Sequence, residues 1–142
     1  TALRTSIKHQ PWLIDNQVPA GISCDSFPGP LGQVLSNLIQ NAIVHGFADR
    51  DQGRIQISAS VDKELLQLQV SDDGVGMNTA TSVRIFEPFF TTRLGKGGSG
   101  LGLSICHRIT TTILAGELRV DSTPGVGTRF TLSMPLRTPG TL

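Results

Sequence analysis

Four glycines fall within the six positions 97–102, and the residues that follow them have helical spacing. Because glycine has no Cβ atom, this backbone can adopt positive φ and approach a ligand closely. The unpaired amides at the start of the following helix, together with its dipole, favour an anion such as a nucleotide phosphate chain. Glycine-rich helix starts also serve as hinges or tight packing sites, so the motif needs support from the rest of the chain.

Two asparagines four positions apart indicate a second kind of chemistry. Asn37 and Asn41 lie on one face of a predicted helix, and His45 continues the same line. An amide oxygen, phosphate oxygens and waters together form an ordinary ligand set for Mg²⁺ bound to a nucleotide. The alternative interpretation is a solvated polar face, because helices often carry polar residues at this spacing.

An acidic segment with two glycines follows the second strand of a predicted hairpin. The carboxylates of Asp72 and Asp73 can accept a hydrogen bond from an exocyclic amine. Gly74 and Gly76 let the backbone approach a flat ring, and Met77 can pack against that ring. The alternative is an acidic turn. A calcium loop is excluded because its spaced oxygen ligands and terminal glutamate are missing.

Length and composition predict one domain with its own core. The chain has 142 residues and a mass of 15.1 kDa, which is enough to bury a core without disulfides or a structural metal. Twelve Lys and Arg against eleven Asp and Glu give a net charge of +1, which argues against nucleic acid or an anionic membrane surface as a partner. Cys24 and Cys106 lack metal-ligand spacing, so we expect reduced, buried thiols.

The chain starts at Thr1 without a methionine, which indicates a segment of a longer protein. Its apolar stretches are far shorter than the ~20 residues that span a bilayer. We therefore expect a cytoplasmic domain, whose parent protein could still be anchored in the inner membrane.

Apolar periodicity predicts two helices and two hairpins. The helices have apolar residues at helical spacing, with a glycine soon after each, and cover residues 31–45 and 100–114. Alternation of apolar and polar residues and turn-rich connections predict two antiparallel hairpins. The predicted strands are 55–61, 66–70, 118–120 and 130–132.

Helices and strands that are interspersed and joined by short turns predict the fold class. We expect an α+β fold, a two-layer α/β sandwich whose mixed, largely antiparallel sheet is covered on one face by helices. Weaker patterns predict the end of a helix within 1–10, a strand at 22–24 and a mobile loop at 94–99.

The candidate segments, taken in chain order, resemble the sequence boxes of sensor histidine kinases. The N box is resembled by NLIQNA at 37–42 and the G1 box by DDGVG at 72–76. The F box is resembled by FEPFFTTR at 86–93, the G2 box by GSGLGL at 98–103, and the last glycine box by GVGTRF at 125–130. Five boxes in the right order argue against coincidence. The chain therefore resembles the catalytic ATP-binding domain of a two-component histidine kinase, in the ATPase group that includes gyrase, Hsp90 and the mismatch-repair ATPases. The resemblance implies the Bergerat fold.

The resemblance also implies roles for individual residues. In the family, the position of Asn41 coordinates Mg²⁺, with that of Asn37 close to it. The position of Asp72 binds the adenine amino group, partly through a water, and Gly76 shapes the pocket beneath the ring. The amides of 98–103 would hold the triphosphate, in agreement with the independent interpretation of that loop.

The F box and the loop 91–99 would form a lid over the nucleotide. Arg93 and Lys96 lie in this lid and could contact phosphates or remain solvated, while Thr128 would lie near the adenine. The predicted catalytic residues are Asn37, Asn41 and His45. The predicted nucleotide-binding set is Asn41, Asp72, Gly74, Gly76, Met77, Arg93, Lys96, Gly98, Ser99, Gly100, Leu101, Gly102, Leu103 and Thr128, with Asn41 and Asn37 as Mg²⁺ ligands.

The N box departs from the family pattern after its alanine. Many members carry a lysine and then a tyrosine there, whereas Ala42 is followed by Ile43, Val44 and His45. A different cation has to contact the phosphates, and His45 or a lid residue could replace the lysine.

The phosphoacceptor histidine of the family has an acidic neighbour and a following proline, and no histidine of this sequence fits that pattern. His9 lacks the acidic neighbour, His45 belongs to the N-box helix, and His107 lies on the helix after the glycine loop. The phosphoacceptor is therefore expected on a separate dimerisation domain.

The resemblance implies a kinase domain that uses ATP and Mg²⁺ and transfers the γ-phosphoryl group to that histidine, for onward transfer to a response regulator. The implied partners are ATP or ADP, the histidine-bearing dimerisation domain of the same parent and a receiver domain, with no nucleic acid. The isolated domain is expected to be monomeric and the parent homodimeric. Residues 1–18 would end the dimerisation domain or form a linker, 19–135 would form the catalytic domain, and 136–142 a tail or linker.

Three alternative functions stay open at this point. An anti-sigma-type serine kinase would share Asn41, Ala42 and His45, but the long lid at 86–99 argues against it. An ATP-driven clamp of the gyrase or Hsp90 kind would need a hydrolytic glutamate one turn before Asn41, where this chain has Asn37. A nucleotide-binding regulatory or scaffold module would keep the glycines without kinase activity.

Overall fold

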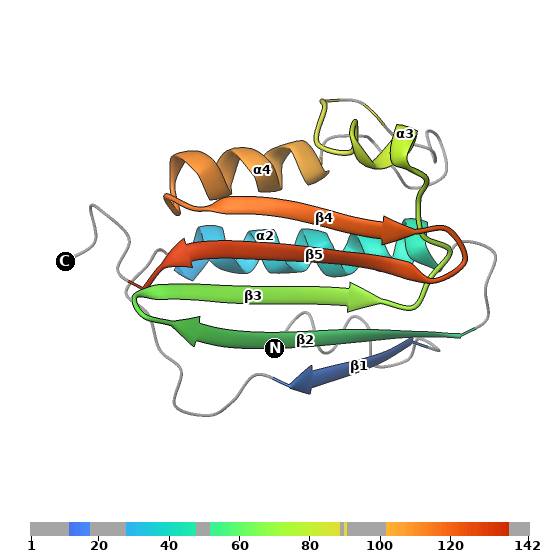
Figure 1. Cartoon of the computed structure of the whole chain (residues 1–142), viewed down its shortest axis with the longest axis horizontal. Coiled ribbons are helices and arrows are strands. Elements are labelled where there is room, and N and C mark those ends of the chain that lie inside the picture. Colours follow the sequence, from blue (N-terminus) through green and yellow to red (C-terminus); the bar gives the residue numbers. More distant parts are fainter. Residues whose placement is uncertain (1–11, 18–27, 48–51, 89, 91–101, 137–142) are drawn as a thin grey trace.

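The computed structural model describes residues 12–17, 28–47, 52–88, 90 and 102–136, and these form a five-stranded sheet with helices packed on it (Figure 1). The strand order across the sheet is β1-β2-β3-β5-β4. In chain order the elements are β1 (Trp12–Gln17), α2 (Pro28–Asn41), the π-helical turn η1 (Ala42–Gly46), β2 (Gly53–Asp62), β3 (Leu65–Asp72), α3 (Thr79–Ser82), α4 (Gly102–Thr112), β4 (Glu117–Thr123) and β5 (Gly127–Pro135).

The sheet is mixed and largely antiparallel, as the sequence predicts. The strands β2 and β3 form one antiparallel hairpin, and β4 and β5 form the other. The strand β5 also pairs with β3 in antiparallel orientation, which joins the two hairpins into one sheet. Figure 1 shows α2 and α4 running along the strands, and the two helices pack against each other. The predicted α+β class is therefore confirmed.

The apolar core lies between the sheet and these helices. The strand register places Leu68, Leu132 and Leu118 directly opposite one another on three neighbouring strands, and all three are buried. Leu38 of α2 and Ile109 of α4 belong to the same buried cluster. This apolar layer fixes the register of the strands, because a slip by one residue would turn their side chains to the opposite face.

The first predicted helix divides into two elements. The apolar spacing predicts one helix over 31–45, but α2 ends at Asn41 and η1 continues as a π turn to Gly46. The amide of Phe47 donates to the carbonyl of Ala42, five residues back, at 2.9 Å. A π turn accommodates one extra residue and is frequent at functional sites. A periodicity near 3.6 does not distinguish such a turn from the last turn of an α-helix.

The start of the fold differs from the expected domain limit. The sequence predicts that residues 1–18 precede the domain, but residues 12–17 form β1, which pairs in parallel with β2. A domain start at residue 19 therefore leaves out an edge strand of the sheet. A parallel strand pair needs a long crossover connection, so no local turn pattern reveals it. The predicted helix end within 1–10, the strand at 22–24 and the loop at 94–99 lie outside the described residues.

The end of the fold also extends by one residue. The amide of Leu136 donates to the carbonyl of Glu64 at 2.8 Å, and the Leu136 side chain packs against the core. Residue 136 is therefore attached to the folded body, although the sequence predicts a tail from that position.

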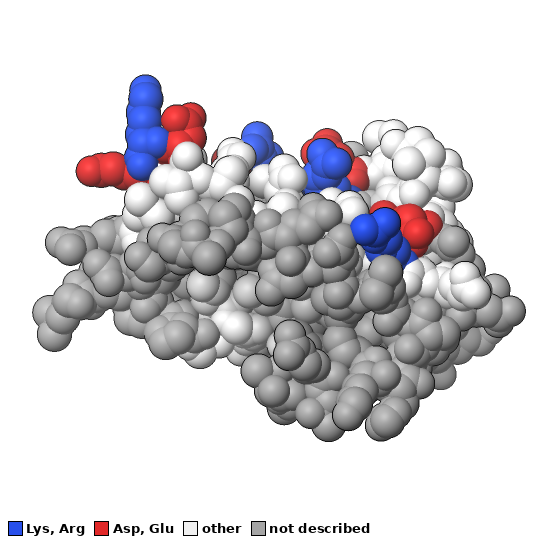
Figure 2. All heavy atoms as spheres, turned by 90° about the horizontal axis from the view of Figure 1, so that it is seen from below, with Lys and Arg blue, Asp and Glu red and all other residues white. Residues whose placement is uncertain are grey.

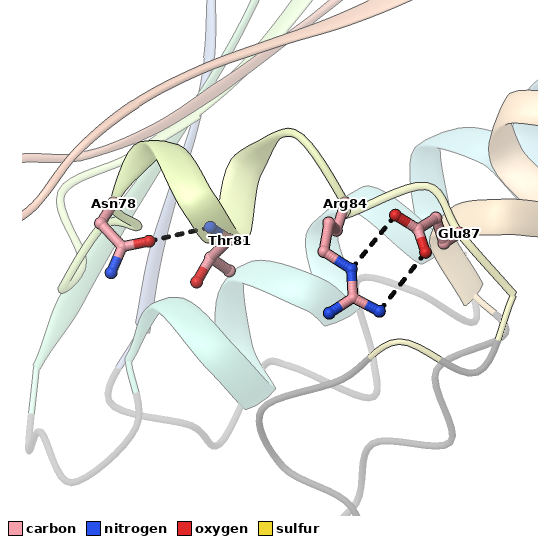
Figure 3. Close-up of polar contacts among 4 residues, drawn as sticks. All are labelled: Asn78, Thr81, Arg84 and Glu87. Carbon is pink, nitrogen blue, oxygen red and sulfur yellow. Dashed lines mark hydrogen bonds and ion pairs between the residues drawn. The ribbon is translucent and has the colours of Figure 1, made fainter.

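A short helix, α3, forms where the apolar pattern predicts none. The Oδ1 atom of Asn78 accepts a hydrogen bond from the amide of Thr81 at 2.8 Å, which is the geometry of an N-cap (Figure 3). The longer helix α4 begins at Gly102 and ends at Thr112, inside the predicted range 100–114. Among the helices of the described ranges, none combines the length and apolar character needed to cross a membrane.

Candidate functional site

One end of the sheet, at the right of Figure 1, gathers segments that are far apart in the sequence. The strands β3 and β4 end there and β5 begins there, because neighbouring antiparallel strands alternate in direction. The helix α2 ends with η1 at the same place, and α4 begins there. This end carries most of the described residues that the sequence predicts for the site.

Asp72, the last residue of β3, lies at this end beside η1. Its register partner on β5 is Thr128. The Oδ1 atom of Asp72 accepts a hydrogen bond from the amide of Gly74 at 2.9 Å, and a Cβ atom on Gly46 would lie 3.1 Å from the same oxygen. The side chain is half-buried. Because an ionised carboxylate only accepts hydrogen bonds, Asp72 offers acceptor atoms to a ligand at this end of the sheet.

The loop after β3 packs closely against η1. The amide of Val75 donates to the carbonyl of Gly46 at 2.8 Å. A Cβ atom on Gly74 would lie 2.5 Å from the carbonyl carbon of Gly46 and 2.7 Å from its Cα atom. Only glycine at position 74 permits this approach, so the contact holds Asp72 and the π turn together.

The neighbouring carboxylate of Asp73 has a different role. Its Oδ1 atom accepts a hydrogen bond from the amide of Arg54 at 2.9 Å, and its own amide donates to the carbonyl of Arg54 at 3.2 Å. The two bonds extend the pairing of β3 with β2. Of the two acidic residues in this segment, Asp72 is therefore the one placed beside η1.

The hairpin of β4 and β5 supports the other side of the same loop. Gly76 has φ +71°, and a Cβ atom there would lie 2.7 Å from the carbonyl carbon of Thr123. The amide of Gly125 donates to the carbonyl of Val75 at 2.7 Å. The positive φ and the close approach both require glycine at position 76. The loop is thus held between η1 on one side and the hairpin on the other.

The predicted row of polar residues spans α2 and η1. Asn37 lies in α2, Asn41 is its last residue, and His45 lies within η1, and all three side chains are half-buried. The Nδ2 atom of Asn37 donates to the carbonyl of Gly102 at 3.5 Å. This long bond connects α2 to the first residue of α4, so the N box and the end of the glycine loop are neighbours.

Cys106 of α4 lies fully buried beside the same helix. Burial raises the pKa of its thiol from 9.0 to about 11, and a hydrogen bond from the Asn37 side chain opposes part of that rise. Its Sγ atom lies 3.7 Å from the carbonyl oxygen of Val34 and donates to it. The thiol is therefore protonated and inert at neutral pH, as the sequence predicts for a buried thiol. Cys24 lies outside the described residues.

The start of the F box is anchored by aromatic contacts. The ring of Phe86 stacks on His107 of α4 with the centroids 5.2 Å apart and meets Phe130 of β5 edge-on at 6.2 Å. Arg84 forms an ion pair with Glu87 at 3.2 Å, drawn in Figure 3. Its guanidinium carbon also lies 4.6 Å from the ring centroid of Phe90. The stacking of Phe86 on His107 places the start of the predicted lid against α4.

Part of the predicted nucleotide set lies outside the described residues, namely Arg93, Lys96, Gly98, Ser99, Gly100 and Leu101. Gly102 is exposed at the start of α4. The side chain of Leu103 belongs to the buried core, so only its backbone amide remains for a phosphate.

Two residues of this end were missed by sequence reasoning. Gly46 was predicted only to end a helix, but it contacts Gly74 and approaches Asp72. Ser122 of β4 accepts a hydrogen bond from the amide of Met77 at 2.7 Å. The positions of glycine and serine are visible in the sequence, but the partners that they contact are not.

Charged side chains do not gather in one patch on the face shown in Figure 2. Among the described residues visible there, basic and acidic side chains lie next to each other in small groups. This mixture of the described side chains fits the small net charge of +1.

Known proteins match this chain in sequence and in fold. The model of a family described as histidine kinase-, DNA gyrase B-, and HSP90-like ATPase matches residues 28–138. Sensor histidine kinase RcsC of Salmonella typhimurium (strain LT2) is 39% identical over 127 residues, and sensor protein TorS of Escherichia coli (strain K12) is 36% identical over 124 residues. Each of these matches covers 87% of this chain and 13% of the relative.

The fold of this chain is also similar to that of a solved histidine kinase domain. The catalytic domain of histidine kinase ThkA has a TM-score of 0.81 and 25% identity, and the match covers 96% of this chain and 86% of that one. The resemblance to sensor histidine kinases found in the sequence is therefore confirmed. The chain spans 13% of the length of the two curated relatives.

Proposed function

The chain belongs to the family of histidine kinase-, DNA gyrase B- and HSP90-like ATPases, and we propose that it is the ATP-binding kinase domain of a sensor histidine kinase. It binds ATP with Mg²⁺ and transfers the γ-phosphoryl group to a histidine on a separate dimerisation domain of its parent. The group then passes to the receiver domain of a response regulator. The parent is a homodimer whose kinase domains lie in the cytoplasm.

The observation that carries this proposal is the meeting of Asp72, η1 and the start of α4 at one end of the sheet. Asp72 offers acceptor atoms to the amino group of adenine. The amides at the start of α4 offer donors to phosphates, and the helix dipole has the sign that favours them. One nucleotide placed along η1 could therefore contact both.

Magnesium fits the amide chemistry of α2. The side chains of Asn37 and Asn41 carry amide oxygens, which are hard ligands of the kind that Mg²⁺ takes. Asn41 and Asn37 would hold the ion together with phosphate oxygens and waters. The Nδ2 atom of Asn37 donates to Gly102, which leaves its amide oxygen as the ligand atom. Bound Mg²⁺ would neutralise charge that develops on the phosphates during transfer.

The residues of this chain bind and orient the nucleotide, because phosphoryl transfer depends mainly on positioning and charge stabilisation. Asp72 fixes the base, and the amides of 98–103 hold the phosphates. His45, Arg93 or Lys96 supplies the cation that the N box lacks. The γ-phosphorus forms a bond to an imidazole nitrogen while its bond to the bridging oxygen breaks, and ADP leaves with that electron pair. The ring proton passes to a base on the dimerisation domain.

A phosphotransfer assay tests the proposal. The chain is mixed with Mg²⁺, ATP labelled at the γ-phosphate, and a dimerisation domain taken from its parent protein. We expect an acid-labile, alkali-stable label on that domain, and no label with the Asp72→Asn chain. A chain that binds ATP without labelling a histidine would be a regulatory module instead, and a phosphoserine product would identify a serine kinase.

A further inference from the structure

Ser122 forms hydrogen bonds with three residues at this end of the sheet. Its Oγ atom accepts a hydrogen bond from the amide of Met77 at 2.7 Å. It donates to the carbonyl of Gly127 at 3.1 Å, and it lies 2.8 Å from Oγ1 of Thr128. A single hydroxyl thus connects the loop after β3 to the first two residues of β5.

The chemistry of these partners determines the direction of the bond to Thr128. A hydroxyl has one hydrogen to donate, and a carbonyl oxygen can only accept. All three contacts are satisfied at once only if the hydrogen of Ser122 points to Gly127. The hydroxyl of Thr128 then donates to Ser122, and the Oγ1 atom of Thr128 keeps lone pairs but has no hydrogen left for a ligand.

The strand register places Thr128 beside the candidate base-binding carboxylate. Asp72 and Thr128 are direct partners on β3 and β5, and Thr128 is the direct partner of Ser122 on β4. Directly opposite residues share a face of the sheet. The three side chains therefore form one row, in which Asp72 and Thr128 both present hydrogen-bond acceptors.

We propose that Ser122 is a positioning residue that turns the hydroxyl of Thr128 into an acceptor and thereby selects a nucleotide whose base carries an exocyclic amine at the Asp72 position. The inference rests on the proposed function, because it concerns the same nucleotide site. Adenine presents an amine donor on this edge, whereas guanine presents a carbonyl oxygen there. Two acceptors in one row favour the amine and repel the carbonyl. Thr128 is 6% exposed, so it acts on the base directly at its small exposed surface or through a bound water.

Calorimetry with ATP and with GTP tests this inference. In Ser122→Ala, Thr128 has no acceptor at position 122, and its hydroxyl is free to donate to guanine. We expect ATP affinity to fall about tenfold. We expect GTP affinity to fall less than ATP affinity, or to rise. The ratio of ATP affinity to GTP affinity therefore falls. Ser122→Thr, which keeps a hydroxyl on a strand, restores both quantities.

The control is Ser60→Ala, which removes an exposed serine hydroxyl from β2 and should change neither affinity. Thr128→Val provides a second arm that does not depend on the folding of Ser122→Ala. It should lower the same affinity ratio, and adding Ser122→Ala to it should lower the ratio no further, because Ser122 acts through Thr128.

The outcomes separate this inference from the function on which it rests. If the unaltered chain binds neither nucleotide, the proposed function fails. If it binds ATP but Ser122→Ala keeps the same ratio, or weakens ATP and GTP by equal factors, Ser122 only supports the fold and the inference is overturned. The same conclusion follows if Thr128→Val leaves the ratio unchanged.

Discussion

The substitution Gly74→Ala tests the close contact between the loop after β3 and η1. A Cβ atom at this position would lie 2.5 Å from the carbonyl carbon of Gly46, where an ordinary contact begins near 3.4 Å. The carbonyl oxygen of Gly46 would lie closer still, so one backbone must move by at least about 0.9 Å, the difference between these two distances. Such a movement also lengthens the hydrogen bond from Val75 to Gly46, which is 2.8 Å in the structure.

The expected cost combines two effects. Overpacking of a closely packed site costs about 1–3 kcal/mol, and the weakened hydrogen bond adds about 1 kcal/mol. We expect Gly74→Ala to lower the free energy of unfolding by about 2–4 kcal/mol. For a chain of this length, the melting temperature should fall by about 4 °C per kcal/mol. ATP affinity should fall about tenfold or more in the folded variant, because Asp72 shifts away from η1.

Urea and thermal denaturation measure the stability, and calorimetry measures the affinity. The matched control is Gly32→Ala in α2, where an added Cβ atom meets nothing within 4 Å. The same change there should stabilise the chain by about 0.5–1 kcal/mol, because alanine is the better helix former. If Gly74→Ala unfolds within about 0.5 kcal/mol of the unaltered chain, the contact with Gly46 does not constrain this loop.

Three further predictions follow from the contacts around the site. Phe86→Ala should cost about 2 kcal/mol in urea denaturation, because it removes a half-buried ring that stacks on His107; a change below about 0.5 kcal/mol would contradict that packing. Burial raises the pKa of Cys106 from 9.0 to about 11, so above pH 9 the unfolded chain loses the thiol proton that the folded chain keeps. Stability should therefore fall between pH 9 and pH 11 by about 2–3 kcal/mol relative to Cys106→Ala, and parallel pH profiles of the two chains would refute this. Arg84→Ala should cost less than about 1 kcal/mol, because its ion pair with Glu87 is exposed, and a larger loss in thermal denaturation would show that the pair supports the fold.

The sequence predicts those helices and strands whose residue pattern lies within one continuous segment of the chain. Alternating apolar residues in β2 and β3 predict the hairpin, and apolar residues at helical spacing predict α4. The buried face of α4 is formed by Leu103, Cys106, Ile109 and Thr110, whereas Ile105 and Ile113 are exposed. The strand β1 could not be found in this way, because its partner lies more than thirty residues away and a parallel pair leaves no turn signal. The π turn could not be predicted from the sequence either. Its hydrogen bond reaches the carbonyl five residues back, one further than in an α-helix, and this leaves the apolar pattern unchanged.

In the candidate site, too, some residues could be predicted from a sequence motif and others only from contacts formed in the folded chain. Asp72 and Gly76 belong to a motif that sequence reasoning could recognise, and their placement in the structure depends on partners that no motif contains. Gly46 and Ser122 are ordinary residues in the sequence, and they matter because folding brings them to Asp72 and Met77. Tertiary contacts of this kind arise only when strands and helices distant along the chain have packed.

The most direct test of the account is calorimetry of ATP binding in the presence and absence of Mg²⁺, with the unaltered chain, Asp72→Asn and Asn41→Ala. Asp73→Asn is the matched control, because that carboxylate bonds to the backbone of Arg54. We expect the unaltered chain and the control to bind ATP in a magnesium-dependent way. Asp72→Asn should bind at least about tenfold more weakly, and Asn41→Ala should lose the dependence on Mg²⁺. No binding by the unaltered chain, or equal binding by all four folded chains, would contradict the account.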